Sequence, residues 1–91
     1  MAAELTVTVR NPHGLHARPA AEFVQAAARY KATVTVRNLS ANRGPAPAKS
    51  ILSLLSLGVR AGDEVRLTAE GEDAESALAA LGALLDAEPA G

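Results

Sequence analysis

The sequence predicts an α+β domain in which one antiparallel sheet carries three helices on one of its faces. Two observations support this prediction. In several short segments apolar and polar residues alternate, which is typical of half-buried strands, and in other segments the apolar residues recur every three or four positions, which is typical of helices with one apolar face. The order is strand, helix, strand, strand, helix, strand, helix. Strands that alternate so cleanly favour an antiparallel sheet with one covered face.

The first strand and the first helix are joined by a short irregular segment. Residues 5–10 alternate between apolar and polar, and the apolar positions are Leu5, Val7 and Val9. From Ala17 onward the apolar residues follow helical spacing: Ala20, Phe23, Val24, Ala27 and Tyr30. These patterns predict a half-buried strand followed by a helix with one apolar face.

Two further strands are predicted after this helix. Val34 and Val36 lie between threonines, which indicates a second strand. The segment 44–48 contains Pro45 and Pro47, and a proline cannot donate a hydrogen bond to a β-ladder. We therefore expect 44–48 to form at most a short strand at the edge of the sheet.

The second half of the chain predicts a short helix, a strand and a longer helix. Ser50 to Leu57 form the short helix, and Gly58 occupies the position after its C-terminus. The apolar residues of the strand are Val65, Leu67 and Ala69. The last helix has a buried stripe of six residues: Ala74, Ala77, Leu78, Leu81, Leu84 and Leu85. Asp73 precedes this helix and is predicted to cap it.

The composition is that of an ordinary folded domain. With 91 residues the chain is expected to form one domain, residues 1–91, which is too small to enclose a deep catalytic cleft between domains. The formal net charge of -1 gives no general attraction to nucleic acid or to an anionic membrane. There is no cysteine, which excludes disulfides and thiolate metal sites. The sequence shows neither a leader nor the ~20 consecutive apolar residues that span a bilayer, so it predicts a cytoplasmic protein.

His16 lies where a loop meets the first helix, within the run Asn11-Pro12-His13-Gly14-Leu15-His16-Ala17-Arg18-Pro19-Ala20. Pro19 suits an early helical position, which places His16 near the N-cap. The first amides of a helix have no internal carbonyl partners and carry the positive end of the helix dipole, so they bind anions such as a phosphoryl group. We expect the backbone of Ala17 and Arg18, together with the Arg18 guanidinium, to hold this group.

The imidazole of His16 is the candidate nucleophile. A neutral imidazole offers a lone pair, and an ordinary histidine is mostly neutral at cytoplasmic pH. His13 is a loop residue that could pair with His16 on a metal, but no further ligand of a suitable type lies close in the sequence. We therefore expect neither a metal nor a cofactor.

The run His13-Gly14-Leu15-His16-Ala17-Arg18-Pro19-Ala20 is followed later by Lys49-Ser50-Ile51-Leu52-Ser53-Leu54-Leu55-Ser56-Leu57-Gly58. These two segments resemble the two signatures of the HPr family, the phosphocarriers of the bacterial phosphoenolpyruvate-dependent phosphotransferase system (PTS). The likeness covers nearly the whole chain. It implies an HPr-like open-faced β-sandwich of βαββαβα order, with a four-stranded antiparallel sheet and the three helices on one face.

The resemblance also implies a function. The chain would be a carrier that is transiently phosphorylated on Nδ1 of His16 and is not a stand-alone catalyst, and Arg18 would stabilise the phosphate. The donor would be enzyme I, itself charged from phosphoenolpyruvate, and the acceptors would be sugar-specific enzyme IIA components. We expect a monomer that binds these proteins, and neither nucleic acid nor a membrane.

Ser50 has two interpretations that are compatible with each other. Its hydroxyl is predicted to cap the short helix by accepting from an amide two or three residues later. In part of the HPr family the matching serine is phosphorylated as a regulatory switch, by HPr kinase/phosphorylase. A phosphate there would add charge at a helix N-terminus and alter the surface that partners meet.

The short helix is apolar on most sides, because its only polar stripe consists of Ser50, Ser53 and Ser56. So few residues cannot all be buried against one sheet, and some of its leucines should face solvent. Leu54 is expected in the core. The resemblance marks three other positions as contacts for partner proteins: Ile51, Leu52 and Leu55.

Two alternatives to the general carrier remain open from the sequence. The segment 38–45 looks longer than the tight hairpin of many free HPr proteins and more like that of fused HPr domains, which favours a carrier dedicated to a dihydroxyacetone kinase route. The other alternative is a regulatory binding module that acts through Ser50 without carrying phosphate. His16 and Arg18 argue against it, because such a module needs no nucleophile.

Overall fold

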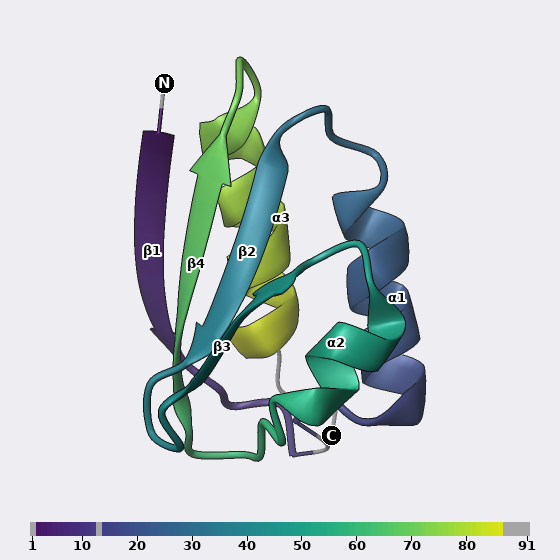
Figure 1. Ribbon diagram of the computed structural model, residues 1–91, viewed down its shortest axis with the longest axis vertical. Helices are drawn as coiled ribbons and strands as arrows, with labels where there is room; N and C mark the ends of the chain where they lie inside the picture. Colours follow the sequence, from purple (N-terminus) through teal and green to yellow (C-terminus); the bar gives the residue numbers. More distant parts are fainter. Residues whose placement is uncertain (1, 13, 87–91) are drawn as a thin grey trace.

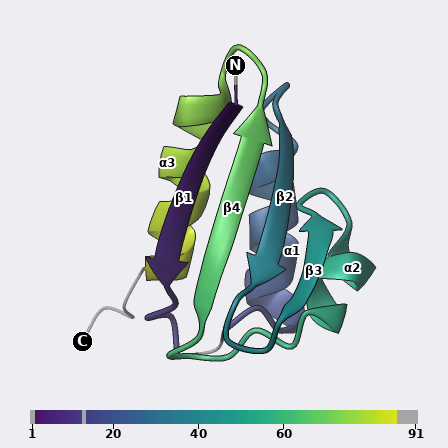
Figure 2. The ribbon, with the colours of Figure 1, turned by 60° about the vertical axis from the view of Figure 1, so that its left-hand side comes forward.

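The protein has two layers, a four-stranded antiparallel sheet and three helices that cover one of its faces (Figure 2). The structure, a computed structural model, describes residues 2–12 and 14–86. Its elements are β1 Ala2–Thr8, α1 Ala17–Ala27, β2 Thr33–Asn38, β3 Arg43–Pro47, α2 Ile51–Ser56, β4 Glu64–Glu70 and α3 Ala74–Asp86. The predicted fold class and the predicted order of elements are confirmed (Figure 1).

The strands lie in the order β1-β4-β2-β3, so β4 pairs with both β1 and β2 although it is the last strand in the sequence. Leu67 of β4 lies opposite Leu5 of β1 and Val36 of β2. A row of apolar side chains thus crosses three strands and packs into the core. β3 forms one edge, as its two prolines predict, because a missing N–H is tolerated there.

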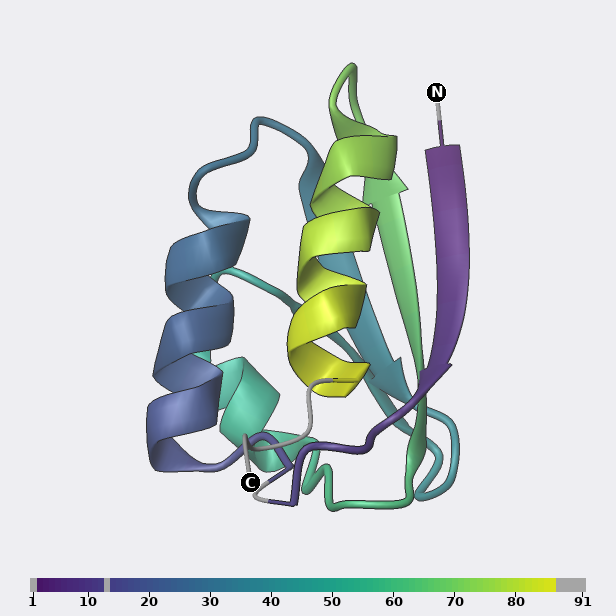
Figure 3. The same cartoon turned by 180° about the vertical axis from the view of Figure 1, so that it is seen from behind.

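The helices bury the residues that their periodicity predicts, with one difference. Seen from behind, α1 and α3 lie side by side over the sheet, and α2 packs near one end of α1 (Figure 3). Phe23 of α1 and Leu81 of α3 are fully buried between these layers. Leu84, predicted in the buried stripe of α3, is only partly buried, at the margin of the core. Gly82 permits the close approach of α3 to β1, since a Cβ there would lie 2.7 Å from Leu5 Cδ2.

The connection between β2 and β3 is short. Asn38 pairs with Arg43, which leaves four residues, 39–42, between the strands. A connection of this length is ordinary for a hairpin. The pairing of β2 with β3 is irregular between Val36 and Asn38, and residues 43–45 belong to β3.

Asp73 occupies the N-cap position of α3, as predicted, since its C=O accepts from Ala77 N–H at 2.9 Å. Its two carboxylate oxygens accept hydrogen bonds from the backbone amides of Lys31, at 2.9 Å, and Ala32, at 2.8 Å. The carboxylate thus also ties the start of α3 to the segment that leaves α1, a contact that the sequence does not predict. The sequence pattern shows what precedes a helix, but it does not show that the segment leaving α1 ends beside it.

Candidate functional site

The candidate site lies at one end of the molecule, where the connection from β1 to α1 meets the segment after α2 (Figure 1). Backbone hydrogen bonds join the segments here. Val9 N–H donates to Asp63 C=O at 2.8 Å, Gly62 N–H donates to Val9 C=O at 2.8 Å, and Arg10 N–H donates to Leu85 C=O at 2.9 Å. The loop that carries His16 is thus tied to β4 and to the end of α3.

His16 is the N-cap residue of α1, as predicted. Its backbone is extended, with φ -100° and ψ 176°, and its carbonyl accepts the first helical bond from Ala20 N–H at 2.8 Å. The side chain makes no capping hydrogen bond and is exposed. The imidazole is therefore free to react with a group that arrives from solvent.

The first turn of α1 begins with Ala17 and Arg18. Ala17 and Arg18 occupy the first turn, where no intrahelical carbonyl can accept from them. Pro19 follows and has no N–H, and the Ala20 amide is already bonded to His16. The Arg18 side chain is exposed. Binding of an anion by Ala17 and Arg18 stays a prediction.

Gly14 and Leu15 hold the His16 loop against the segment after α2. Gly14 has φ +59°, and a Cβ on it would lie 2.3 Å from Val59 O, so only glycine fits this contact. Leu15 is buried, and its N–H donates to Val59 C=O at 3.1 Å. Two loops that lie far apart in the sequence are thereby in direct backbone contact.

An open depression lies beside His16. Its lining consists of Pro12, His16, Arg60 and Ala61. Arg18 is not part of this lining, although it shares the first turn of α1 with His16. Sequence reasoning missed Arg60, because nothing in the pattern around it shows that the segment after Gly58 returns to the His16 loop.

One buried polar residue organises this end of the molecule. Asn38 is fully buried, and its Nδ2 donates to Leu57 C=O at 3.0 Å and to Asp63 Oδ2 at 3.2 Å. Its Oδ1 accepts from Ala41 N–H at 3.1 Å. Asn38 therefore links the β2–β3 hairpin, the end of α2 and the segment before β4. Sequence reasoning also missed this role, since an asparagine at a strand end normally indicates only a turn.

Ser50 caps α2 as predicted, since its Oγ accepts from Ser53 N–H at 3.3 Å. The helix leaves a compact apolar surface uncovered. Leu52 is 78% exposed, while Leu54 is fully buried. We call the exposed side chains of α2 the leucine patch; its members are Ile51, Leu52 and Leu55. The predicted division of this helix between core and surface is confirmed.

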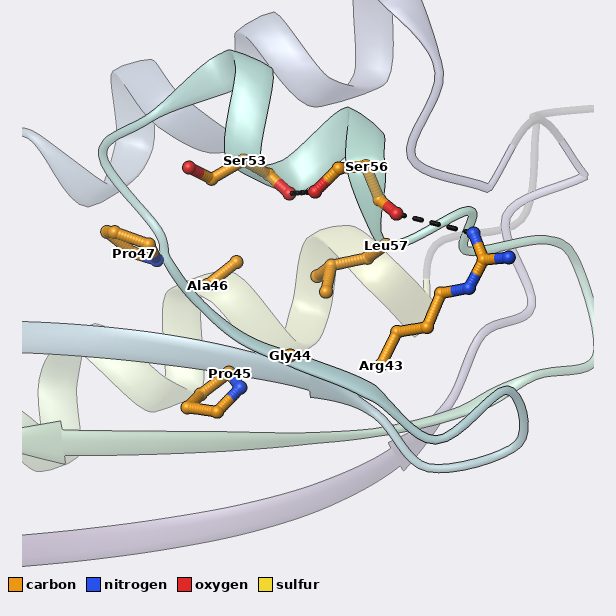
Figure 4. A pocket seen from close by; sticks show the side chains of 8 residues that line it. All are labelled: Arg43, Gly44, Pro45, Ala46, Pro47, Ser53, Ser56 and Leu57. Atoms are coloured by element: carbon orange, nitrogen blue, oxygen red, sulfur yellow. Dashed lines mark hydrogen bonds between the residues drawn. The ribbon is translucent and has the colours of Figure 1, made fainter.

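A second open hollow lies on the other side of α2, between this helix and β3 (Figure 4). Arg43 Nη1 donates to Ser56 C=O at 3.4 Å, and Ser56 Oγ donates to Ser53 C=O at 2.6 Å. These bonds hold β3 to the end of α2. No residue proposed for phosphoryl chemistry lines this hollow, so it is separate from the candidate site.

Residues 2–12 and 14–86 contain no cluster of three side chains that could hold a metal ion, and His13 lies outside the described residues. Among the described residues no helix is both long and apolar enough to cross a membrane.

Comparison with known proteins gives a consistent result. The sequence pattern of the family described as "PTS HPr component phosphorylation site" matches residues 3–87. The chain is 47% identical over 78 residues to the phosphocarrier protein HPr of Haloferax volcanii. This alignment covers 86% of this chain and 86% of that protein. The crystal structure of the phosphocarrier protein HPr from Bacillus anthracis superposes with a TM-score of 0.87 at 39% identity, covering 93% of this chain and 98% of that one.

Similarity extends to a larger class of proteins. The chain is 46% identical over 74 residues to the multiphosphoryl transfer protein of Salmonella typhimurium, a match that covers 81% of this chain but 20% of that protein. The chain thus spans about a fifth of the length of this relative. With a family match over nearly all of its residues and full-length structural similarity, the chain belongs to the HPr family of PTS phosphocarriers.

Proposed function

We propose that this chain is a histidine phosphocarrier, formed by one HPr domain over residues 1–91, that accepts a phosphoryl group on His16 from phospho-enzyme I. It passes the group to enzyme IIA components of the sugar phosphotransferase system. The observation that carries the proposal is the exposed His16 imidazole, which has no capping hydrogen bond and lies at the N-terminus of α1. Membership of the HPr family supports this function.

The transfer step needs few groups from this chain. The lone pair of a neutral His16 ring nitrogen attacks the phosphorus of phospho-enzyme I, the new P–N bond forms, and the donor leaves with the electron pair of the broken bond. The phosphorylated ring releases the N–H proton of its other nitrogen, and the leaving group of the donor takes up one proton, so the exchange balances. The same exchange in reverse direction delivers the group to the acceptor protein.

After transfer, His16 carries a dianionic group beside the start of α1. The free amides of Ala17 and Arg18 can donate to its oxygens, and the helix dipole favours negative charge at this end. The Arg18 guanidinium can reach the same group from the first turn and donates through charged N–H groups. Because these donors are fixed before the reaction, they stabilise the developing charge with little reorganisation.

The leucine patch is the proposed docking surface for enzyme I and for enzyme IIA. Ile51, Leu52 and Leu55 are exposed on a helix that packs against α1, whose N-terminus carries His16. Apolar side chains at the surface of a small domain commonly mark a contact with another protein. A partner seated on α2 would therefore lie close to the phosphorylated histidine.

Ser50 is the proposed regulatory phosphorylation site, for an enzyme of the HPr kinase/phosphorylase type. Its hydroxyl is partly buried and engaged in the cap of α2, at the start of the leucine patch. A phosphate here would place two negative charges beside the docking surface. This would weaken binding of partners without unfolding the helix.

We further propose that the protein works as a monomer in the cytoplasm. Its proposed donor is charged from phosphoenolpyruvate, which is a metabolite of the cell interior. Among the described residues the large exposed apolar side chains are confined to α2, and this area is small for a stable interface between copies.

The alternatives are less well supported. The dedicated dihydroxyacetone kinase route rests on the length of the segment 38–45 alone, whereas the family match and the similarity to HPr proteins support the general carrier. A regulatory module that acts only through Ser50 would not explain why an exposed His16 imidazole lies at the start of α1. The family match describes a phosphorylation site of the PTS HPr component, which favours the carrier.

Intact mass spectrometry tests the proposal. The protein and its His16→Ala variant are incubated with phosphoenolpyruvate and a bacterial enzyme I, and then briefly acidified. We expect one acid-labile phosphoryl group on the unchanged protein and none on the variant, while circular dichroism shows the same fold. Arg18→Glu should slow the gain, because a like charge repels the phosphoryl group. Phosphate on the His16→Ala variant would overturn the assignment.

A further inference from the structure

Arg60 lies beside His16 although the two are 44 positions apart in the sequence. The two side chains line the same open depression, together with Pro12 and Ala61. Arg60 follows α2 and belongs to the segment that leads into β4. It is therefore a second arginine next to the reactive imidazole, on a different segment from Arg18.

The backbone of Arg60 is held in place on both sides. Its N–H donates to Asp63 Oδ2 at 3.0 Å, and its C=O accepts from Asp63 N–H at 3.0 Å. The same Asp63 oxygen accepts from buried Asn38 Nδ2 at 3.2 Å. The Asp63 carboxylate is therefore engaged with backbone and amide donors, and the turn that carries Arg60 is fixed to the core.

This turn is also fixed relative to His16. Leu15 N–H donates to Val59 C=O at 3.1 Å. Leu15 directly precedes His16, and Val59 directly precedes Arg60. A Cβ on Gly14 would lie 2.9 Å from Arg60 Cα, so the two backbones touch. The base of the Arg60 side chain consequently keeps a constant distance from the His16 loop.

The Arg60 guanidinium has no carboxylate partner among the described residues. Ion pairs occur elsewhere, between Arg10 and Asp86 at 3.7 Å and between Arg66 and Glu4 at 3.8 Å. Arg60 is exposed, and the segment around it contributes no acidic side chain to the depression. An exposed arginine beside an anion-binding helix start is free to pair with an anion that arrives there.

We propose that Arg60 is a second phosphate-holding residue, whose guanidinium donates hydrogen bonds to oxygens of the phosphoryl group on His16. The proposal rests on the proposed function of His16 as phosphoryl acceptor. Arg18 would approach the group from the helix, and Arg60 from the segment after α2. Two guanidinium groups that hold the phosphoryl group from different sides fix its orientation and stabilise its negative charge.

The experiment uses the isolated phosphorylated protein, so that no partner protein contributes. Phosphoramidate, a small phosphoryl donor to imidazole, loads His16 in a His13→Gln background, in which one histidine remains. The pH midpoint of the ³¹P signal of phosphohistidine is then measured for the parent and for Arg60→Ala and Arg60→Lys. Arg29→Ala is the matched control, because it removes the same charge beyond the opposite end of α1.

A nearby cation favours the dianion, so its removal raises the midpoint. We expect Arg60→Ala to raise it by roughly half a pH unit, the size expected for an exposed pair of charges. Arg60→Lys should retain most of the effect, and Arg29→Ala should leave the midpoint unchanged. Equal midpoints for Arg60→Ala and Arg29→Ala would overturn the proposal.

Transfer kinetics separate this role from partner binding. If Arg60 contacts only enzyme I, Arg60→Ala raises KM for transfer while the ³¹P midpoint stays at the parent value, and the proposal is wrong. Failure of enzyme I to label His16 would instead refute the proposed function, and the phosphoramidate measurement would still decide the role of Arg60.

Discussion

Asp73 shows how a single carboxylate can join distant segments. Its oxygens accept from the amides of Lys31 and Ala32, 42 and 41 residues away in the sequence. The hydrogen bond from Lys31 is the main cause of a lowered pKa for Asp73, helped by the Ala32 amide and the Lys31 charge, while desolvation opposes the shift. The charged carboxylate therefore stabilises the junction between α1, β2 and α3.

The pH dependence of stability follows from this shift. Because the folded-state pKa of Asp73 is depressed, its contribution is present above the unfolded value of 3.8 and is lost as the pH falls through the folded value. We expect Asp73→Asn to lower Tm at pH 7 and to differ less from the parent below pH 3.8. Thermal unfolding followed by circular dichroism between pH 2.5 and pH 7 provides the measurement.

Glu72→Gln is the control for this prediction. Glu72 is the exposed neighbour of Asp73, so its substitution removes the same charge without removing the two amide bonds. A constant Tm difference between Asp73→Asn and the parent over the whole pH range would contradict the linkage. Equal effects of Asp73→Asn and Glu72→Gln would show that charge alone matters.

At the residue scale the sequence predicts local roles better than distant ones. His16 and Ser50 were both correctly placed as helix caps, because capping depends on the next few residues. Asn38 and Arg60 were missed, and so were the distant partners of the Asp73 carboxylate, because these partners come from segments that only the folded chain brings close. Hydrophobic periodicity holds no information about such polar contacts.

At the scale of elements, the six residues of α2 both pack into the core and present an apolar surface to solvent. Leu54 points into the core and is fully buried, whereas Leu52 is 78% exposed. The helix is thus fixed by one side chain and by the Ser50 cap, and it presents the leucine patch on the outside. Removal of a patch residue should affect partners, and removal of the core residue should affect folding.

Leu52→Ser tests this division of roles. We expect it to change stability by less than about 0.5 kcal/mol, as for most surface substitutions. It should raise KM for phosphoryl transfer from enzyme I by about fivefold to tenfold, as expected for the loss of an apolar anchor at an interface. Urea unfolding and steady-state transfer assays measure the two effects.

Leu54→Ala is the comparison variant within the same helix. It should cost about 2–5 kcal/mol of stability, because it leaves a cavity in the core. An unchanged KM for Leu52→Ser would mean that enzyme I does not use the leucine patch. A large loss of stability in Leu52→Ser would mean that this side chain is not simply a surface residue.

All seven elements follow from periodicity and from turn chemistry. Alternation located β1, β2 and β4, and the prolines at positions 45 and 47 located an edge strand. The strand order β1-β4-β2-β3 was not predicted, because periodicity identifies which face of a strand is buried but not which strand is its neighbour.

At the scale of the whole molecule, the proposed monomer is a quantitative expectation. A stable interface between copies normally buries more than ~1,200 Å² in total, and three exposed apolar side chains on one short helix supply much less. We expect the mass of a monomer by sedimentation equilibrium at both low and high micromolar concentration. A mass that rises toward that of a dimer with concentration would contradict this expectation. The edge strand β1 would then be the next surface to test as an interface.

Pro19 has a consequence for the energetics of transfer. It has no N–H, so the third position of the first turn offers no backbone donor to a group bound at the start of α1. One further charge-assisted hydrogen bond would stabilise the phosphorylated protein by ~1.5–3 kcal/mol. At ~1.4 kcal/mol per factor of ten, that would shift the equilibrium with the next acceptor by roughly ten- to a hundredfold. Pro19 thus weakens the hold of the backbone on a bound phosphoryl group, which favours its transfer to the next acceptor.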